Sequence, residues 1–173
     1  MIKGKDIQLR LIKQSDLSEL YEKWHDSEVR GPYYPLALIP EPLFQQEFAK
    51  NGFWGNDSQR LLIVDEQDNM LGTMHCAKAT NYSDCVELSY ILFNTKKRNK
   101  GYATEAVTLL VDHLFNTRRL NRIQICVPEG NDPSMRVAEK AGFQREGIAK
   151  SAFFLNGKDV DIHVYALLRK EWS

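Results

Sequence analysis

The chain has 173 residues, 43% of them hydrophobic, and its 23 Lys and Arg residues balance 23 Asp and Glu residues. This length and apolar content predict a single domain, residues 1–173, with a buried core. A formal net charge of zero argues against nucleic acid as the main partner, because affinity for the phosphate backbone needs an excess of basic residues on one face.

The sequence also argues against membrane, secreted and metal-binding proteins. It has no run of about 18 apolar residues, as a membrane span needs, and residues 1–6 lack the apolar stretch of a secretory signal. The three cysteines, Cys76, Cys85 and Cys126, are odd in number and share no metal-ligand spacing. We therefore expect a cytoplasmic protein without disulfides and without a bound metal.

The first third of the chain predicts a strand followed by helices. Residues 7–11 alternate apolar and polar side chains, as a half-buried strand does. Asp16 and Glu19 have the spacing of a capping box at a helix start. One helical stripe follows it, formed by Leu17, Leu20, Tyr21 and Trp24. Prolines then interrupt the pattern as far as about residue 55, and only a short helix around residues 43–48 is predicted.

The rest of the chain predicts hairpins around a strand–helix–strand–helix unit. Residues 61–64 and 70–79 predict an antiparallel hairpin with a turn at 66–69. A strand at 86–93, a helix with its apolar stripe at 106–115, a strand at 122–127 and a short helix from Pro133 to Gly142 follow. Asn156 and Gly157 predict the turn of a closing hairpin between strands near 148–155 and 160–168. The order is that of a mixed α/β domain.

The turn before the long helix is the segment most suggestive of ligand binding. Its sequence is Arg98-Asn99-Lys100-Gly101-Tyr102-Ala103. Backbone N–H groups at a helix N-terminus attract anions, and Gly101 allows close approach of a ligand. Lys96, Lys97, Arg98 and Lys100 add positive charge. The turn predicts a di- or polyphosphate ligand, although an ordinary turn with a solvated charge run is the alternative reading.

The Arg-x-x-Gly-x-Ala pattern of this turn resembles the acetyl-CoA signature of the GNAT superfamily of N-acetyltransferases. Residues 86–92 resemble the family's fourth strand, 98–106 its coenzyme A loop, and 131–143 the exit of its fifth strand and the next helix. The combination looks most like the ribosomal-protein-alanine, Rim-type branch. The resemblance implies an α/β (α+β) GNAT-like acyl-CoA N-acyltransferase fold: a mixed, mostly antiparallel twisted sheet with a central splayed parallel strand pair, flanked by helices.

The resemblance also implies a site for acetyl-CoA as cosubstrate, in the cleft between the splayed strands. Backbone groups of Ile91, Leu92 and Phe93 would pair with the pantetheine arm. The residues expected to hold the pyrophosphate are Arg98, Asn99, Lys100, Gly101, Tyr102, Ala103 and Thr104. Asn131 is expected to contact the pantetheine amide, with local turn stabilisation as the alternative.

Two residues are candidate catalysts. Glu87, in an otherwise apolar strand, is the candidate base that removes a proton from the amine, directly or through water. A carboxylate that merely points to solvent is the alternative. The tyrosine that commonly acts as the acid in the superfamily is replaced here by Ala138. Ser134, also expected to contact the cofactor, is therefore the candidate acid for the leaving thiolate, unless it only satisfies backbone donors in its helix. His75 and His163 are further residues on strands that could face the cleft.

The acceptor is expected among aromatic residues of the proline-broken segment, which in GNAT proteins usually walls the acceptor side. Tyr33, Tyr34 and Trp54 are the candidates, with ordinary packing as the alternative. The leading hypothesis is an acetyl-CoA-dependent N-acetyltransferase that acts on a primary amine, first of all a protein or peptide N-terminus, by direct attack in a ternary complex.

Two other hypotheses stay open. One is a small-molecule N-acetyltransferase whose acceptor is an antibiotic, a nucleoside or a polyamine. The other is a non-catalytic coenzyme A-binding module, which the missing tyrosine at Ala138 favours slightly. As partners we expect an amine acceptor, no nucleic acid and no membrane, with the chain a monomer or a homodimer.

Overall fold

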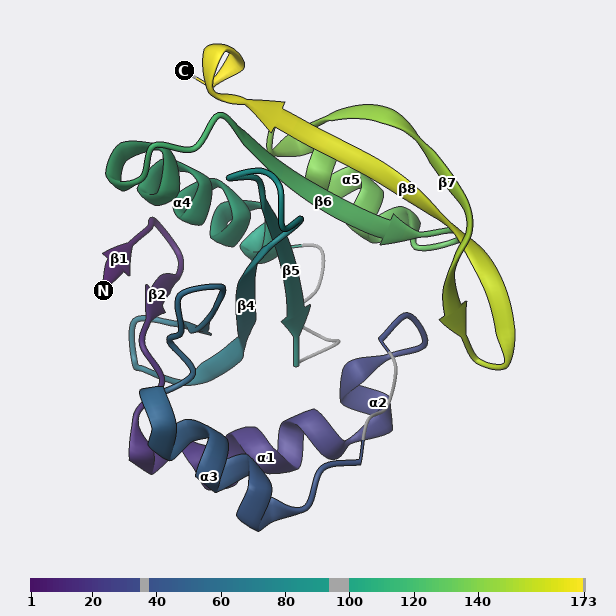
Figure 1. Ribbon diagram of the computed structural model, residues 1–173. Helices are drawn as coiled ribbons and strands as arrows, with labels where there is room; N and C mark the ends of the chain where they lie inside the picture. The colour runs from purple at the N-terminus through teal and green to yellow at the C-terminus, as the bar shows by residue number, and fades with distance from the viewer. Residues whose placement is uncertain (35–37, 94–99, 173) are drawn as a thin grey trace.

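The computed structural model describes residues 1–34, 38–93 and 100–172, which form an eight-stranded sheet with helices on both faces (Figure 1). The strands are β1 (Ile2–Lys3), β2 (Gln8–Arg10), β3 (Ser58–Val64), β4 (Met70–Lys78), β5 (Val86–Leu92), β6 (Arg122–Pro128), β7 (Gln144–Leu155) and β8 (Lys158–Leu168). The helices are α1 (Leu17–His25), α2 (Ser27–Arg30), α3 (Glu41–Asn51), α4 (Tyr102–Thr117) and α5 (Asp132–Lys140), with 3-10 turns at Gln14–Asp16 and Arg169–Glu171. The strand order is β1-β2-β3-β4-β5-β6-β8-β7.

The pairing of β5 with β6 is the feature of the sheet that matters most for the site. These strands run parallel, whereas all other neighbours in the sheet described run antiparallel. They pair only at Val86 with Ile123 and at Glu87 with Gln124. Beyond these pairs the two strands diverge, as Figure 1 shows. The predicted mixed sheet with a splayed parallel pair is therefore confirmed.

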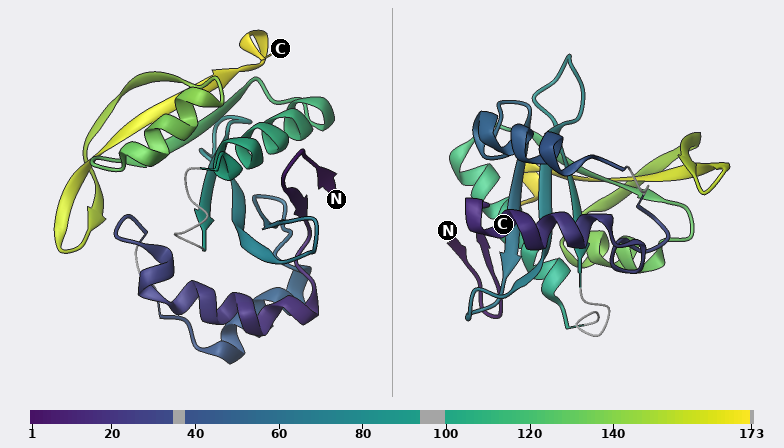
Figure 2. Two further views of the ribbon diagram at one scale, coloured as in Figure 1. Left: turned by 180° about the vertical axis from the view of Figure 1, so that it is seen from behind. Right: turned by 90° about the horizontal axis from the view of Figure 1, so that it is seen from below.

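Two buried clusters hold the helices on the sheet. The larger cluster, on the face that carries α4 and α5, includes Leu88 of β5 and Leu110 of α4. On the other face, Leu20 of α1 and Phe44 of α3 share a cluster with Leu62 of β3. Figures 1 and 2 show α1 and α3 well apart from α4 and α5. Because each such side chain contributes about 1.5–3 kcal/mol when fully buried, the two clusters fix the positions of the helices.

The central and C-terminal elements follow the sequence pattern closely. The six buried residues of α4 are Ala106, Val107, Leu110, Val111, Leu114 and Phe115, the predicted stripe. At α5, the Asn131 side chain caps the helix by accepting a hydrogen bond from the Ser134 N–H. Asn156 and Gly157 both have positive φ, 50° and 80°, which a two-residue type I′ hairpin turn requires.

The start of α1 differs from the prediction. The helix begins at Leu17, after a 3-10 turn, and Asp16 makes no side-chain cap there. The Asp16 carboxylate instead accepts hydrogen bonds from the Lys13 N–H at 2.6 Å and from the Arg10 guanidinium at 2.7 and 3.0 Å. Two hydrogen bonds from one charged guanidinium outweigh a cap on a neutral backbone N–H, because in them both partners carry charge. The predicted capping box between Asp16 and Glu19 is therefore wrong.

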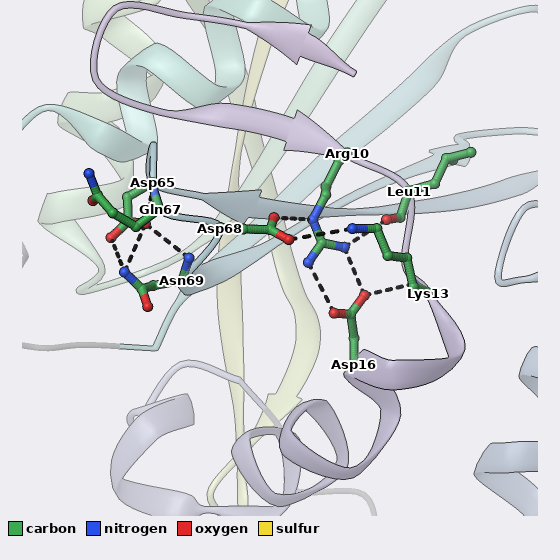
Figure 3. Close-up of polar contacts among 8 residues, drawn as sticks. All are labelled: Arg10, Leu11, Lys13, Asp16, Asp65, Gln67, Asp68 and Asn69. Atoms are coloured by element: carbon green, nitrogen blue, oxygen red, sulfur yellow. Dashed lines mark hydrogen bonds and ion pairs between the residues drawn. The ribbon is translucent and has the colours of Figure 1, made fainter.

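Arg10 ties three segments of the chain together (Figure 3). It is 5% exposed, and its Nε also donates to Asp68 Oδ1 at 2.5 Å. Asp68 lies in the β3–β4 turn, so one guanidinium connects β2, the start of α1 and this turn. Burial alone would raise the pKa of Asp16, but the hydrogen bonds from Arg10 and Lys13 outweigh it and lower that pKa. The pair is thus charged at neutral pH.

Removal of this guanidinium should destabilise the fold. We expect Arg10→Met to lower the free energy of unfolding by about 3 kcal/mol, because it leaves the largely buried Asp16 carboxylate without its counter-charge. Asp68→Asn is the matched control, since the Asp68 side chain is 51% exposed and should contribute less than about 1 kcal/mol. Urea unfolding at pH 7 measures both. Equal effects of the two substitutions would contradict a dominant Arg10–Asp16 pair.

Candidate active site

Two cavities meet where β5 and β6 diverge. The first, the α4 cavity, has a volume of about 560 Å³ and lies among the end of β5, the N-terminus of α4, and α5. The second, the β8 cavity, has a volume of about 780 Å³ and is lined by parts of α1, α3, β5, β6 and β8. The residues that line both cavities are Arg30, Tyr33, Tyr34, Tyr90, Ile91, Asn131 and Ser134. The gap in the sheet therefore connects two binding volumes.

The α4 cavity is suited to an anion. Gly101, with φ of 85°, precedes the helix, and Tyr102, Ala103 and Thr104 of the first turn line the cavity. The first N–H groups of a helix have no acceptor within the helix, and its dipole adds partial positive charge there. Arg136 and Lys140 of α5, which the sequence reasoning missed, line the same cavity. Their side chains add two cations to the cavity that the helix terminus lines.

The remaining predicted cofactor residues are distributed unevenly. Ile91 and Leu92 line the α4 cavity, on the part of β5 that has no partner on the β6 side among the strands described. Phe93 is buried in the cluster on the opposite face, and Lys100 is exposed and lines neither cavity. Arg98 and Asn99, with Lys96 and Lys97, lie outside the described residues. An open strand edge of this kind can pair with an extended amide-containing arm.

Tyr90 and Ser134 form a hydrogen-bonded pair at the junction of the cavities. The Tyr90 hydroxyl lies 2.8 Å from Ser134 Oγ and 3.4 Å from the Ser134 carbonyl oxygen. Burial raises the pKa of Tyr90 to about 12, although the contact with Ser134 acts in the opposite direction. The phenol therefore stays protonated at neutral pH and can donate a hydrogen bond to Ser134. No pattern in the sequence indicates this role, because a tyrosine in an apolar strand cannot be told from an ordinary core aromatic residue.

Glu87 lines the β8 cavity where the parallel pairing ends. Its Oε2 accepts a hydrogen bond from Gln124 Nε2 at 2.9 Å, and Gln124 Nε2 also lies 3.6 Å from Cys126 Sγ. Burial, followed by the charge of Glu87, raises the pKa of Cys126 to about 12. Cys126 is therefore a protonated thiol at neutral pH and a poor nucleophile. Glu87 is the proton acceptor that this part of the cavity offers.

The aromatic candidates for acceptor binding do not lie together. Tyr33 and Tyr34 line both cavities, and the Tyr33 hydroxyl donates to the Gly130 carbonyl at 2.6 Å. The segment that follows α2 also contacts the β7–β8 turn, where Asn156 Nδ2 donates to the Pro32 carbonyl at 3.0 Å. Trp54 is 38% exposed and lines neither cavity. Tyr33 and Tyr34 thus lie at the junction, and Trp54 does not.

The histidines contribute little to the junction. His75 and His163 line neither cavity. Burial, with help from the charge of Arg60, lowers the pKa of His75 to about 4.

Among the residues described, no group of three His, Cys, Asp or Glu side chains gathers as metal ligands. None of the helices described is long and apolar enough to span a membrane.

Known proteins resemble this chain in sequence and in structure. Residues 6–144 match the family described as an acetyltransferase (GNAT) domain. The uncharacterized N-acetyltransferase YnaD of Bacillus subtilis is 32% identical over 99% of both chains. The putative ribosomal N-acetyltransferase YdaF of the same organism is 40% identical, but over only 43% of this chain and 40% of its own. The spermidine N-acetyltransferase of Vibrio cholerae, solved with CoA and spermine, has the same fold, with a TM-score of 0.85 at 20% identity over 98% and 99% of the two chains.

Proposed function

This chain belongs to the GNAT acetyltransferase family, and we propose that its acceptor is the primary amine at the N-terminus of a peptide or protein. Membership of this family makes the chain an acetyl-CoA-dependent N-acetyltransferase. The observation that carries the proposal is the junction of two cavities at Tyr90 and Ser134, with Glu87 on the side away from α4. One cavity suits a cofactor with a pyrophosphate, and the other has room for an amine with several residues attached.

The residues around the α4 cavity fit coenzyme A. Gly101, Tyr102, Ala103 and Thr104 would hold the pyrophosphate at the helix terminus, with Arg136 and Lys140 as counter-charges. Ile91, Leu92 and Asn131 would hold the pantetheine arm along the open edge of β5. Arg98 and Asn99 complete the proposed site from the signature pattern alone. Trp54, a candidate for acceptor binding, is not part of the proposed site, because it lines neither cavity.

The catalytic roles fall to residues at the junction and to Glu87 in the β8 cavity beside it. Acetyl-CoA supplies an activated thioester, so direct attack by the amine in a ternary complex needs no nucleophile from the protein. Glu87 takes the proton from the ammonium form of the acceptor, directly or through water. Ser134 Oγ would pass its proton to the departing sulfur and take up the proton that the amine nitrogen loses as it becomes the amide, and Tyr90 orients that hydroxyl.

A polyamine is the second candidate acceptor. The observation in its favour is the fold shared with the spermidine acetyltransferase at 20% identity, and a shared fold does not by itself fix the acceptor. The partial similarity to a putative ribosomal acetyltransferase favours a protein N-terminus instead.

The test is a panel of amines with acetyl-CoA, followed by release of free thiol. We expect the highest kcat/KM with peptides that begin with Ala or Ser, and acetylation at the α-amine by mass spectrometry. Higher kcat/KM with spermidine than with every peptide would contradict the proposed acceptor. Thermal stabilisation by coenzyme A without any thiol release would favour a non-catalytic binding module.

Glu87→Gln should lower kcat about 100-fold near pH 7 while leaving the dissociation constant of coenzyme A unchanged, because only deprotonation of the amine is impaired. The defect should shrink as pH rises toward the pKa of the amine, since the free base then forms without help. Initial rates between pH 6.5 and 9.5 measure this. Glu47→Gln is the matched control, since Glu47 lines the same cavity from α3. A defect that is constant across this pH range would remove Glu87 from the proton transfer.

A further inference from the structure

Two arginines give one part of the β8 cavity a positive charge. Arg30 at the end of α2 lies over the ring of Tyr34, with 4.6 Å from its guanidinium carbon to the ring centroid. Arg60 of β3 lies over the ring of Trp24 at 5.0 Å. Both guanidinium groups belong to residues that line the cavity. Stacking on an aromatic ring holds a guanidinium in place while its edge can still bind a ligand. Arg30 is held further by Nη1, which donates to the Trp24 carbonyl at 2.8 Å.

Arg60 has no acidic partner within the described residues. Its side chain forms no ion pair and no hydrogen bond there, whereas Arg10 and Arg122 both pair with carboxylates. Glu47 and Glu87 line the same cavity but form no ion pair with Arg60 in this part of the chain. A half-buried guanidinium that lacks a counter-ion is suited to bind one from a ligand.

The charges of Arg30 and Arg60, which line the same cavity, affect each other. Burial lowers the pKa of Arg30, and the nearby charge of Arg60 lowers it further against the opposing effect of Tyr34. His25, which also lines the cavity, is engaged by the backbone through both ring nitrogens: Nδ1 lies 2.8 Å from the Tyr21 carbonyl oxygen and Nε2 lies 3.3 Å from the Ile39 N. An anion placed between the two arginines would relieve their mutual repulsion.

The sheet register places this positive region at a defined distance from Glu87. Arg60 lies opposite His75, and His75 lies opposite Ser89, so the three residues form one row across β3, β4 and β5. Glu87 is on the same face, two residues before Ser89. With strands about 4.8 Å apart and about 3.3 Å per residue along a strand, the Cα atoms of Arg60 and Glu87 are about 12 Å apart. A ligand of dipeptide size can reach both side chains.

We propose that the acceptor carries an anionic group as well as its amine, and that Arg60 and Arg30 bind this group while the amine lies beside Glu87. This deepens the proposed function and rests on it. The anionic group is a carboxylate or a phosphate a few bonds from the amine, such as an acidic side chain at the second residue of a peptide. A polyamine would instead bring a second ammonium group toward two guanidinium groups.

Matched peptides test the charge preference. The acceptors are Ala-Asp-Ala-amide, its Asn and Lys counterparts, a phosphoserine counterpart and spermidine. We expect the KM of the Asp or the phosphoserine peptide to be at least tenfold below that of the Asn peptide, with the Lys peptide and spermidine highest. The lower KM of the two acidic peptides tells whether carboxylate or phosphate is preferred.

Substitution of Arg60 tests the assignment to this residue. Arg60→Gln should raise the KM of the preferred acidic peptide at least tenfold, and Arg60→Glu should reverse the preference toward the Lys peptide. The exposed Arg119 supplies the control Arg119→Gln, which should keep the acidic preference. Bound coenzyme A, measured by calorimetry, shows that each variant is folded.

Three outcomes would overturn the inference. Equal KM for all peptides, or an unchanged preference in Arg60→Gln, would do so while the proposed function stands. A lower KM for spermidine than for every peptide would contradict both the acidic acceptor and the peptide acceptor. No acetylation of any of these amines would overturn the proposed function, and the inference with it.

Discussion

Gly101→Glu raises the dissociation constant of coenzyme A at least 100-fold, which is about 2.7 kcal/mol or more. The new carboxylate would lie at the N-terminus of α4, where the structure otherwise offers N–H donors, Arg136 and Lys140 to an anion. It would neutralise this positive region and repel the pyrophosphate. Isothermal titration calorimetry at constant ionic strength measures the effect.

The control for this substitution is Gly101→Gln. Gly101 has φ of 85°, so any side chain there costs about 1–2 kcal/mol of backbone strain. Among the residues described, no heavy atom outside its neighbours lies within 4 Å of a Cβ added at this position. The Gln variant has the same size and strain as the Glu variant without the charge. We expect it to weaken binding less than tenfold. Equal losses in both variants would mean that backbone strain, not the anion site, explains the effect.

Ser134→Ala lowers kcat about 100-fold while the dissociation constant of acetyl-CoA changes less than threefold, because the hydroxyl acts on the leaving sulfur in the transition state. Tyr90→Phe should lower kcat about tenfold through loss of the hydrogen bond that orients Ser134. Ser18→Ala, on the exposed surface of α1, is the control. Single-turnover rates with a peptide acceptor separate chemistry from product release.

A variant that combines Ser134→Ala with Tyr90→Phe tests whether Tyr90 acts through Ser134. If Tyr90 acts only through Ser134, then Tyr90→Phe should have no further effect on kcat once Ser134 is Ala. Multiplicative losses in the double variant would show that the two residues act independently. Unchanged kcat in Ser134→Ala would remove Ser134 from the mechanism and leave Tyr90 as the donor at the junction.

Local patterns in the sequence predicted the elements that form from near neighbours in the chain. The stripe of α4, the Asn156-Gly157 turn and the punctuation of α5 by Pro133 and Gly142 are decided within one or two helical turns or one hairpin. The capping box at Asp16 failed because Arg10, which competes for the carboxylate, reaches it through the tertiary fold. Competition of this kind is invisible to a pattern of spacing.

The residues of the candidate site also fall into two groups, those that local sequence predicted and those that only the fold brings together. A strand, a basic turn and a helix in sequence order pointed to Gly101 and its neighbours. The contact of Tyr90 with Ser134 joins residues 44 positions apart and depends on the splay of β5 from β6. The row from Arg60 to Ser89 depends on the register of three strands. Neither could be read from composition or periodicity.

A crystal structure of the protein with coenzyme A tests the central claim most directly, since that claim is that the two cavities meet at the point of acetyl transfer. We expect the pyrophosphate at the N-terminus of α4, the pantetheine arm along the open edge of β5, and the sulfur within hydrogen-bond distance of Ser134 Oγ. Coenzyme A bound in the α4 cavity with its sulfur directed away from Ser134 and Tyr90, or bound outside that cavity, would contradict the account.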